Sequence, residues 1–247
     1  MVELVYYEMP KEKWQGLLGI REEDIPETLV IEGHLAYPEI FSTRGKKLEE
    51  GRTAWMPNLM IGKYKGRTVG YGVCFGGPMA SQFAHIYCKM GTKRIVLIGE
   101  CGGIRKTVEV GDIVVSEEVL SLDGVSSLYR RPRDHLLFDA QLLEQAELKL
   151  KEKGLKYHIG KTGSYYDILL ERKIDLEELA ISGYISLDME AAAVCAVANH
   201  FEVPSLAMFV VGDNYTIGKD IFYKKTEEEV KMVNDGMEKV LEIALEL

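Results

Sequence analysis

The stretch LIGECGGIRKTVEVGDIVV, residues 97–115, decides the fold class of this chain, because it holds two apolar runs around a glycine-rich segment. The first run ends at Gly99, and Glu100 follows at once, before two further glycines. Short apolar runs rich in β-branched residues are typical of buried strands, and glycine clusters are typical of turns. The stretch therefore predicts strands over 94–99 and 112–120, joined by a glycine turn that carries a carboxylate.

The same alternation of strands and helices continues on both sides of this stretch. Apolar runs predict further strands, and helical periodicity bounded by proline or glycine predicts helices. Strands that alternate with helices are typical of an α/β sheet covered on both faces, and no linker divides the chain, so we expect a single domain over 1–247. The further strands are predicted at 28–31, 67–74, 155–163 and 204–214, and the helices at 76–91, 139–154, 188–200 and about 226–247.

The composition argues against several classes of function. A net charge of −9 and a pI of about 5.2 disfavour nucleic acid or an anionic membrane as the main partner. The sequence has no apolar run long enough for a membrane span and no cleavable leader pattern, so we expect a cytoplasmic protein. Its four cysteines form no CxxC pair and its five histidines lack metal-ligand spacing, which predicts buried thiols and neither a metal nor an organic cofactor.

Five short polar or glycine clusters mark the candidate site. Each one closes a predicted strand or opens the helix that follows a strand. Ligands of α/β sheets bind at the carboxyl ends of the strands, so we expect the five clusters to converge on one rim. They are Glu32-Gly33-His34, Gly76-Gly77, Glu100-Cys101-Gly102-Gly103, Met189-Glu190 and Gly212-Asp213-Asn214.

Two of these acids have chemistry that suits catalysis. Glu190 lies in the first turn of its predicted helix, where the helix dipole keeps a carboxylate ionised and ready to accept hydrogen bonds from a ribose diol. Asp213 follows a buried strand, where desolvation raises the pKa of a carboxyl and allows it to donate a proton. The alternative for Glu190 is a charge that only complements the helix dipole. The alternative for Asp213 is a simple Asp-Asn turn. The amides of Gly76 and Gly77 are expected to approach an anion.

Four segments together resemble the nucleoside phosphorylase family, which comprises purine nucleoside and uridine phosphorylases and the AMP and methylthioadenosine nucleosidases. The resemblance covers about residues 28–247 and implies that family's fold, a three-layer sandwich with a mixed, twisted, partly barrel-like sheet. GECGGIRK (99–106) and WMPN (55–58) are most similar to the AMP nucleosidase branch. The four segments are YKGRTVGYGVCFGGPMAS (64–81), VLIGECGGIRKTVEVGDIVV (96–115), SLDMEAAAVCAVANHFEVP (186–204) and VVGDN (210–214).

The resemblance also implies roles for individual residues. Glu190 would bind the ribose hydroxyls, with Met189 packed under the sugar. Asp213 would protonate or hydrogen-bond a ring nitrogen of the leaving purine, on which Tyr165 or Tyr166 would stack. The family also implies a homo-oligomer, either a dimer or a hexamer, with no cofactor. Further substrate-binding positions are Gly33, His34, Arg52, Gly76, Gly77, Cys101 and Gly102.

The chain departs from the family pattern where phosphate binds. Phosphorolytic members carry an arginine and a serine at the positions of Leu97 and Glu100, and the phosphate loop, here EGHLAYPE (32–39), has lost its arginine. Two carboxylates, Glu32 and Glu100, would then face the anion pocket. A like charge at about 4 Å costs about 4 kcal/mol at an effective dielectric constant near 20. Water activated by such a carboxylate is therefore a candidate acceptor of the sugar.

Two other hypotheses remain open. In ordinary phosphorolysis, Arg52, which resembles an arginine lent by a neighbouring subunit, would hold phosphate together with the Gly77 amide. A non-catalytic nucleoside-binding or storage protein would share the fold with a decayed anion site. Other basic residues have two alternative roles, which are binding of a 5′-phosphate or exposure in solvated loops. They are Arg44, Lys46, Lys47, Arg130, Arg131 and Arg133.

Overall fold

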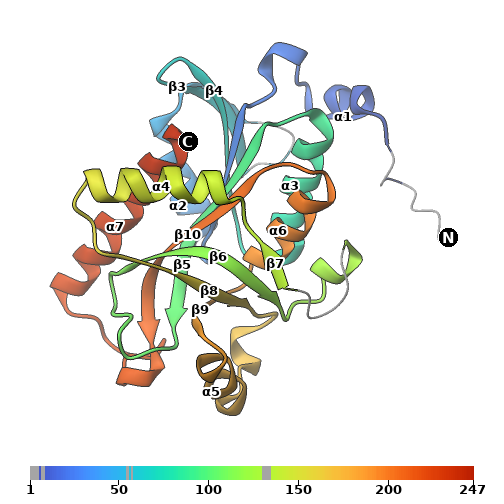
Figure 1. Ribbon diagram of the computed structural model, residues 1–247. Coiled ribbons are helices and arrows are strands. Elements are labelled where there is room, and N and C mark those ends of the chain that lie inside the picture. Colours follow the sequence, from blue (N-terminus) through green and yellow to red (C-terminus); the bar gives the residue numbers. More distant parts are fainter. Residues whose placement is uncertain (1–5, 7–8, 54–55, 57, 130–134) are drawn as a thin grey trace.

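The computed structural model describes residues 6, 9–53, 56, 58–129 and 135–247. Ten strands of this part of the chain form one mixed sheet, and helices cover both of its faces (Figure 1). The predicted three-layer α/β sandwich is therefore confirmed. The strands are β1 (Thr28–Gly33), β2 (Glu49–Thr53), β3 (Leu59–Tyr64), β4 (Arg67–Cys74), β5 (Arg94–Gly103), β6 (Ile113–Ser121), β7 (His135–Leu137), β8 (Tyr157–Ser164), β9 (Tyr184–Asp188) and β10 (Ser205–Asn214).

The sheet is partly closed on itself. Its strand order is β10-β6-β8-β9-β5-β1-β4-β3-β2, with β7 beside β6. An additional pairing of β10 with β5 joins five strands, β10, β6, β8, β9 and β5, into a ring. This ring is the barrel-like part of the sheet, and β1, β4, β3 and β2 extend from it as an open sheet. Strand β5 lies between β1 and β10 and is parallel to both, so the carboxyl ends of these three strands meet at one edge.

Two helical layers cover the sheet (Figure 1). Helices α3 and α6 pack against each other on one face, and α4 and α7 contact each other on the other face. Among the helices of the described residues, none combines the length and the apolar character that a membrane span requires. The α-helices are α1 (Lys11–Leu18), α2 (Tyr37–Arg44), α3 (Gly77–Met90), α4 (Ala140–Glu152), α5 (Lys173–Ile181), α6 (Ala191–His200) and α7 (Glu227–Glu246), and the short 3-10 helices are η1 (Glu22–Asp24), η2 (Gly45–Lys47), η3 (Ser126–Leu128), η4 (Ile168–Leu170) and η5 (Tyr215–Ile217).

Local sequence explains why these helices form and pack as they do. Residues 191–198 of α6 are all buried, because alanine, valine and cysteine are small enough for the helix to lie close to both α3 and the sheet. Helix α7 is amphipathic and begins with a capping box, in which the Thr226 hydroxyl accepts from the Glu229 amide at 3.2 Å and Glu229 accepts from the Thr226 amide at 2.7 Å. Both helices therefore hold the strand ends in fixed positions.

The predicted strands and helices are present, although several of their ends differ by a few residues. The largest difference is in strand β5, which does not end at Gly99, because Gly102 and Gly103 pair with β9 and β10. Strand β10 ends at Asn214 as predicted, so Asp213 lies within the strand and not in a turn beyond it. The glycine turn predicted around Glu100 is thus a continuation of the barrel wall.

Candidate active site

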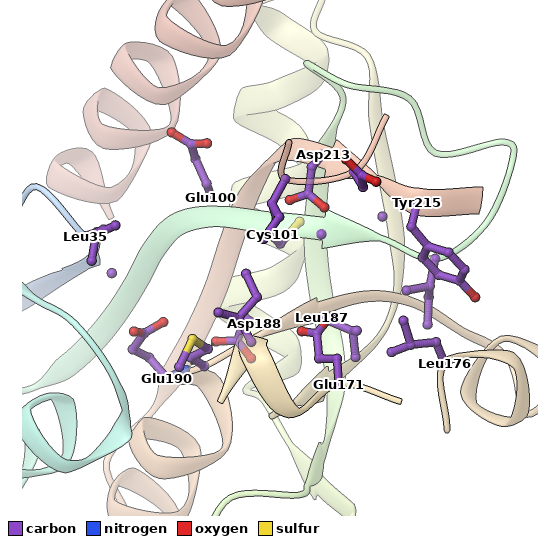
Figure 2. Close-up of a pocket in the computed structure, with 18 of the residues that line it drawn as sticks. Leu35, Glu100, Cys101, Glu171, Leu176, Leu187, Asp188, Glu190, Asp213 and Tyr215 are labelled. Carbon is purple, nitrogen blue, oxygen red and sulfur yellow. Dashed lines mark hydrogen bonds between the residues drawn. The ribbon is translucent and has the colours of Figure 1, made fainter. Parts of the chain in front are cut away.

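A pocket of about 370 Å³ opens where β1, β5, β9 and β10 end (Figure 2). It brings together residues from four of the five predicted clusters, which come from distant parts of the sequence. The predicted residues that line it are Gly33, His34, Glu100, Cys101, Gly102, Met189, Glu190 and Asp213. Gly103, from the third predicted cluster, also lines it. The lining residues that sequence reasoning missed are Leu35, Phe75, Ile104, Ile168, Glu171, Leu176, Leu187, Asp188, Tyr215, Asp220 and Ile221.

Glu190 is held in place by backbone on two sides. Its Oε1 accepts a hydrogen bond from the Gly76 amide at 2.6 Å, so this amide serves Glu190 and is not directed at an anion as predicted. A Cβ at Gly33 would lie 2.7 Å from Glu190 Oε2, which explains the need for glycine there. Glu190 is 6% exposed. The side chain therefore has little freedom to leave the pocket wall.

The stabilisation of Glu190 by the helix N-terminus, as predicted, is not observed. Asp188, and not Glu190, takes the helix N-terminal amides, because its Oδ2 accepts from the Glu190 amide at 2.8 Å and from the Ala191 amide at 2.5 Å. Burial raises the pKa of Glu190, and the neighbouring Asp188 charge raises it further. Burial also raises the pKa of Asp188. The pair consequently holds a proton more readily than exposed acids do.

Asp213 projects from β10 into the same pocket, beside a β-bulge at Gly212. Burial raises its pKa to about 6, although Lys225 lowers it, and the charges of Glu100 and Asp220 raise it further. The predicted rise in the pKa of this carboxyl is confirmed. Figure 2 shows Asp213 toward the side of the pocket that carries Tyr215, whereas Glu190 lies toward the opposite side. The two acids thus face the same space from different ends.

Glu100 lies at the mouth of the pocket. Its side chain is 38% exposed, and its Oε1 is 3.7 Å from His34 Nε2. Burial lowers the pKa of His34, although the Glu100 charge opposes this effect. Glu100 also contacts Gly212, where a side chain would overlap the carboxylate. Glu100 can therefore contact a water molecule in the pocket but provides no positive charge for an anion.

Glu32 does not face the pocket, which corrects the prediction. It is completely buried on β1, where its carboxylate pairs with Arg44 of α2 and accepts a hydrogen bond from the Tyr71 hydroxyl at 2.6 Å. Burial raises the pKa of Glu32, against the effect of Arg44. Neighbouring residues on a strand point to opposite faces, so Gly33 reaches the pocket and Glu32 does not. Its position makes Glu32 a structural residue that fastens α2 to the sheet.

Arg52 and the two aromatic candidates lie away from this pocket. Arg52, on β2, pairs with Asp24 at 2.5 Å and donates to the Gly19 carbonyl. Tyr165 and Tyr166 stack on each other, with ring centroids 4.7 Å apart, and line a second pocket of about 730 Å³. The predicted stacking of these tyrosines on a base in the first pocket is therefore corrected.

The other predicted positions are also occupied by internal contacts. Gly77 lies against α6, where a Cβ would be 3.2 Å from the Ala193 side chain. Arg44 and Lys47 both pair with Glu238. Trp55 and Pro57 of the WMPN motif and the arginines at 130, 131 and 133 lie outside the described residues.

The pocket lining is rich in acidic residues. The described lining residues include no lysine or arginine, and His34 is the basic residue among them. No group of three or more acidic, histidine or cysteine side chains in the described part of the chain is arranged to hold a metal ion. An anionic ligand would therefore meet no lysine or arginine in the described lining, and it would be repelled by those of its carboxyl groups that are ionised. The carboxyl groups that line the pocket are Glu100, Glu171, Asp188, Glu190, Asp213 and Asp220.

Asp188 and Glu171 line the pocket but were not predicted, and only one of them lies in a recognisable sequence pattern. Asp188 stands before the small-residue helix, where an acidic residue is a common helix cap, so its position could have been found. Glu171 lies between η4 and α5, in a segment without a motif. Burial raises its pKa to about 7, and the Asp213 charge adds to this rise.

Comparisons with known proteins identify the family of this chain. The profile of a family described as the phosphorylase superfamily matches residues 37–247. A purine nucleoside phosphorylase DeoD-type 2 from Vibrio vulnificus (strain YJ016) is 29% identical over 194 residues, which are 75% of this chain and 79% of that protein. A purine nucleoside phosphorylase DeoD-type from Hahella chejuensis is 32% identical over 192 residues, which are 74% of this chain and 78% of that protein. A crystal structure of uridine phosphorylase from Vibrio fischeri ES114 matches 97% of both chains with a TM-score of 0.79 at 17% identity, a likeness of fold.

Proposed function

Because this chain belongs to the phosphorylase superfamily, we propose that it cleaves the N-glycosidic bond of a purine nucleoside and transfers the sugar to water. The observation that carries the proposal is that Glu190 and Asp213 both line one pocket. No described lysine or arginine lines this pocket. The pocket volume of about 370 Å³ lies within the range typical of small-molecule sites.

Glu190 is proposed to bind the ribose. Its Oε1 is fixed by the Gly76 amide, and Met189 beside it offers an apolar surface for the sugar ring. Two hydroxyl groups that donate hydrogen bonds would favour the ionised carboxylate and lower the pKa that burial has raised. The charge would then appear beside the sugar when substrate binds. This is where glycosidic cleavage develops positive charge, in an oxocarbenium-like transition state.

Asp213 is proposed to act on the leaving base. Its pKa of about 6 leaves a useful fraction of the carboxyl protonated near neutral pH. A proton delivered to a ring nitrogen converts the departing purine anion into a neutral base. Glu190 and Asp213 would thus stabilise opposite ends of the breaking bond. The purine assignment is supported by the relatives named purine nucleoside phosphorylases.

Water is proposed as the acceptor because of the charges near the expected anion site. Leu97 is fully buried in β5, and Glu100 occupies the mouth of the pocket, so neither residue can replace the missing arginine and serine. A phosphate dianion would have to approach several carboxylates without a described cationic side chain in the lining. A water molecule carries no such penalty, and Glu100 is available as a proton acceptor.

Phosphorolysis is the second candidate, and it is favoured by the names of the relatives. The cation would then have to come from Lys225, whose charge lowers the pKa of Asp213, from residues outside the described set, or from another subunit. Arg52 could serve only after releasing Asp24, with which it pairs at 2.5 Å.

Base release measured with and without phosphate separates these candidates. The protein, freed of phosphate, is incubated with inosine, adenosine and AMP, and both the base and the reducing sugar are quantified. We expect base release without phosphate, free ribose as the product, and poor activity on AMP because of the negative lining. Release that depends on phosphate would refute the hydrolytic proposal, and no release from any substrate would favour a non-catalytic nucleoside-binding protein.

A further inference from the structure

Glu171 is an unpaired acid in an apolar part of the pocket wall. It lies between Ile168 of η4 and Leu176 of α5, and all three residues line the pocket. Glu171 is partly buried. Its side chain makes no hydrogen bond or ion pair with any residue that the structure describes. A carboxyl group in such surroundings lacks the polar partner that burial normally requires, so a ligand is the natural source of one.

The position of Glu171 relative to Asp213 indicates which part of a ligand it meets. The two side chains line one pocket, and they are close enough for the Asp213 charge to affect Glu171. Figure 2 shows both on the side of the pocket with Leu176 and Tyr215, away from Glu190. On a purine, N7 and the C6 substituent share one edge, and N1 follows the C6 substituent on the adjoining edge. If Asp213 reaches N7, its neighbour on the pocket wall reaches the other two groups.

We propose that Glu171 hydrogen-bonds the C6–N1 edge of the leaving purine and thereby selects bases that carry an amino or oxo group at C6. This inference rests on the proposed function, because it assumes that Asp213 marks the base end of the pocket. It goes further by assigning base recognition to a residue outside the catalytic pair.

A neutral carboxyl group fits both kinds of base. In the protonated form it offers one donor and one acceptor side by side. Against a 6-aminopurine, the hydroxyl donates to N1 and the carbonyl accepts from the amino group. Against a 6-oxopurine, the carbonyl accepts from N1–H and the hydroxyl donates to O6. An ionised carboxylate makes only one of these bonds in either case. Burial of Glu171, which raises its pKa to about 7, supports the neutral form.

The test compares two substitutions of Glu171. Glutamine also presents one donor side and one acceptor side, so Glu171→Gln is expected to keep the preference for C6-substituted bases within about threefold. Glu171→Leu fills similar space without polar atoms. For this variant we expect kcat/KM for adenosine and inosine to fall ~10–100-fold, and kcat/KM for purine riboside, which lacks the C6 group, to fall less than about threefold. Glu177→Leu is the matched control, because Glu177 lies on α5 and does not line the pocket.

A second measurement keeps the inference testable if no nucleoside is cleaved. Binding of free adenine, hypoxanthine and unsubstituted purine is measured by calorimetry for the wild type and both variants. We expect the wild type and Glu171→Gln to prefer the C6-substituted bases, and Glu171→Leu to bind all three alike. Absence of cleavage together with this binding pattern would refute the proposed function alone. Equal losses for all three nucleosides, unchanged selectivity in Glu171→Leu, or no binding of any base would overturn the assignment of Glu171.

Discussion

Replacing Asp213 with asparagine tests the proposed acid directly. Asparagine keeps the size of the side chain and can donate a hydrogen bond, but it cannot transfer a proton. With a pKa of about 6 for Asp213, roughly half of the carboxyl groups are protonated at about pH 6 and about a tenth at about pH 7. We therefore expect the wild-type kcat/KM for inosine to fall as the pH rises through about 6 and this fall to approach tenfold per pH unit above it.

The Asp213→Asn variant should differ from the wild type in both the size of kcat and its dependence on pH. General acid catalysis contributes typically 10²–10⁴-fold, so we expect kcat of Asp213→Asn to be lower by ~10²–10³-fold and nearly independent of pH. KM should change less than about threefold, because the ribose end at Glu190 is untouched. Base release is followed by absorbance from about pH 5 to about pH 8.

A substrate that needs no proton provides the control. In 7-methylguanosine the leaving base already carries a positive charge, so its cleavage should be lowered much less by Asp213→Asn than that of inosine. Equal losses for the two substrates, a loss confined to KM, or a variant with the wild-type pH profile would refute the acid role.

Three further predictions concern the surroundings of this acid. Gly33→Ala places a methyl group 2.7 Å from Glu190 Oε2, so we expect KM for ribonucleosides to rise ~10-fold or more; Gly16→Ala, where the added methyl meets nothing within 4 Å, is the control, and equal KM values in the two variants would contradict the reasoning. Glu100→Ser removes a charge at the pocket mouth, and because this side chain is 38% exposed, phosphate affinity measured by calorimetry should improve only about 2–5-fold; no change would mean that the carboxylate does not face the anion site. The folded-state pKa of Asp213 is raised from 3.8 to about 6, so the native state binds this proton more tightly than the unfolded chain, and stability should fall as the pH rises from about 4 to about 6; Asp213→Asn should flatten this part of a Tm-against-pH curve, and an unchanged slope would argue against it.

Much of the fold could be predicted from local patterns. Strands β4 and β6 are short apolar runs with β-branched residues, and α3 carries a proline in its first turn and a glycine at its end. Strand β9 and helix α5 were not predicted, because neither has a clear apolar period. The ring closure depends on β10 pairing with β5, a contact between distant segments that no local pattern encodes.

The candidate site could be predicted only where a residue's neighbours fix its direction. Asp213 and Glu190 line one pocket because each lies at the end of a buried element. The face of the sheet to which the Glu32 side chain points depends on where β1 ends. A shift of one residue along a strand reverses that face. The charge of Glu190 depended on Asp188 taking the helix amides first, a competition between neighbours that helix-dipole arguments alone do not resolve.

The ring formed by β10, β6, β8, β9 and β5 separates the two roles proposed for Asp213 and Glu171. Asp213 belongs to the wall of that ring, where its position is set by backbone pairing with Gly102 of β5. Glu171 lies on the segment between β8 and β9, which contributes no strand to the ring. Under these proposals, mutations in that segment would alter the choice of base during evolution while the proposed acid, Asp213, stays where it is. Homologues that accept other bases are accordingly expected to diverge around Glu171 and to retain the strand that carries Asp213.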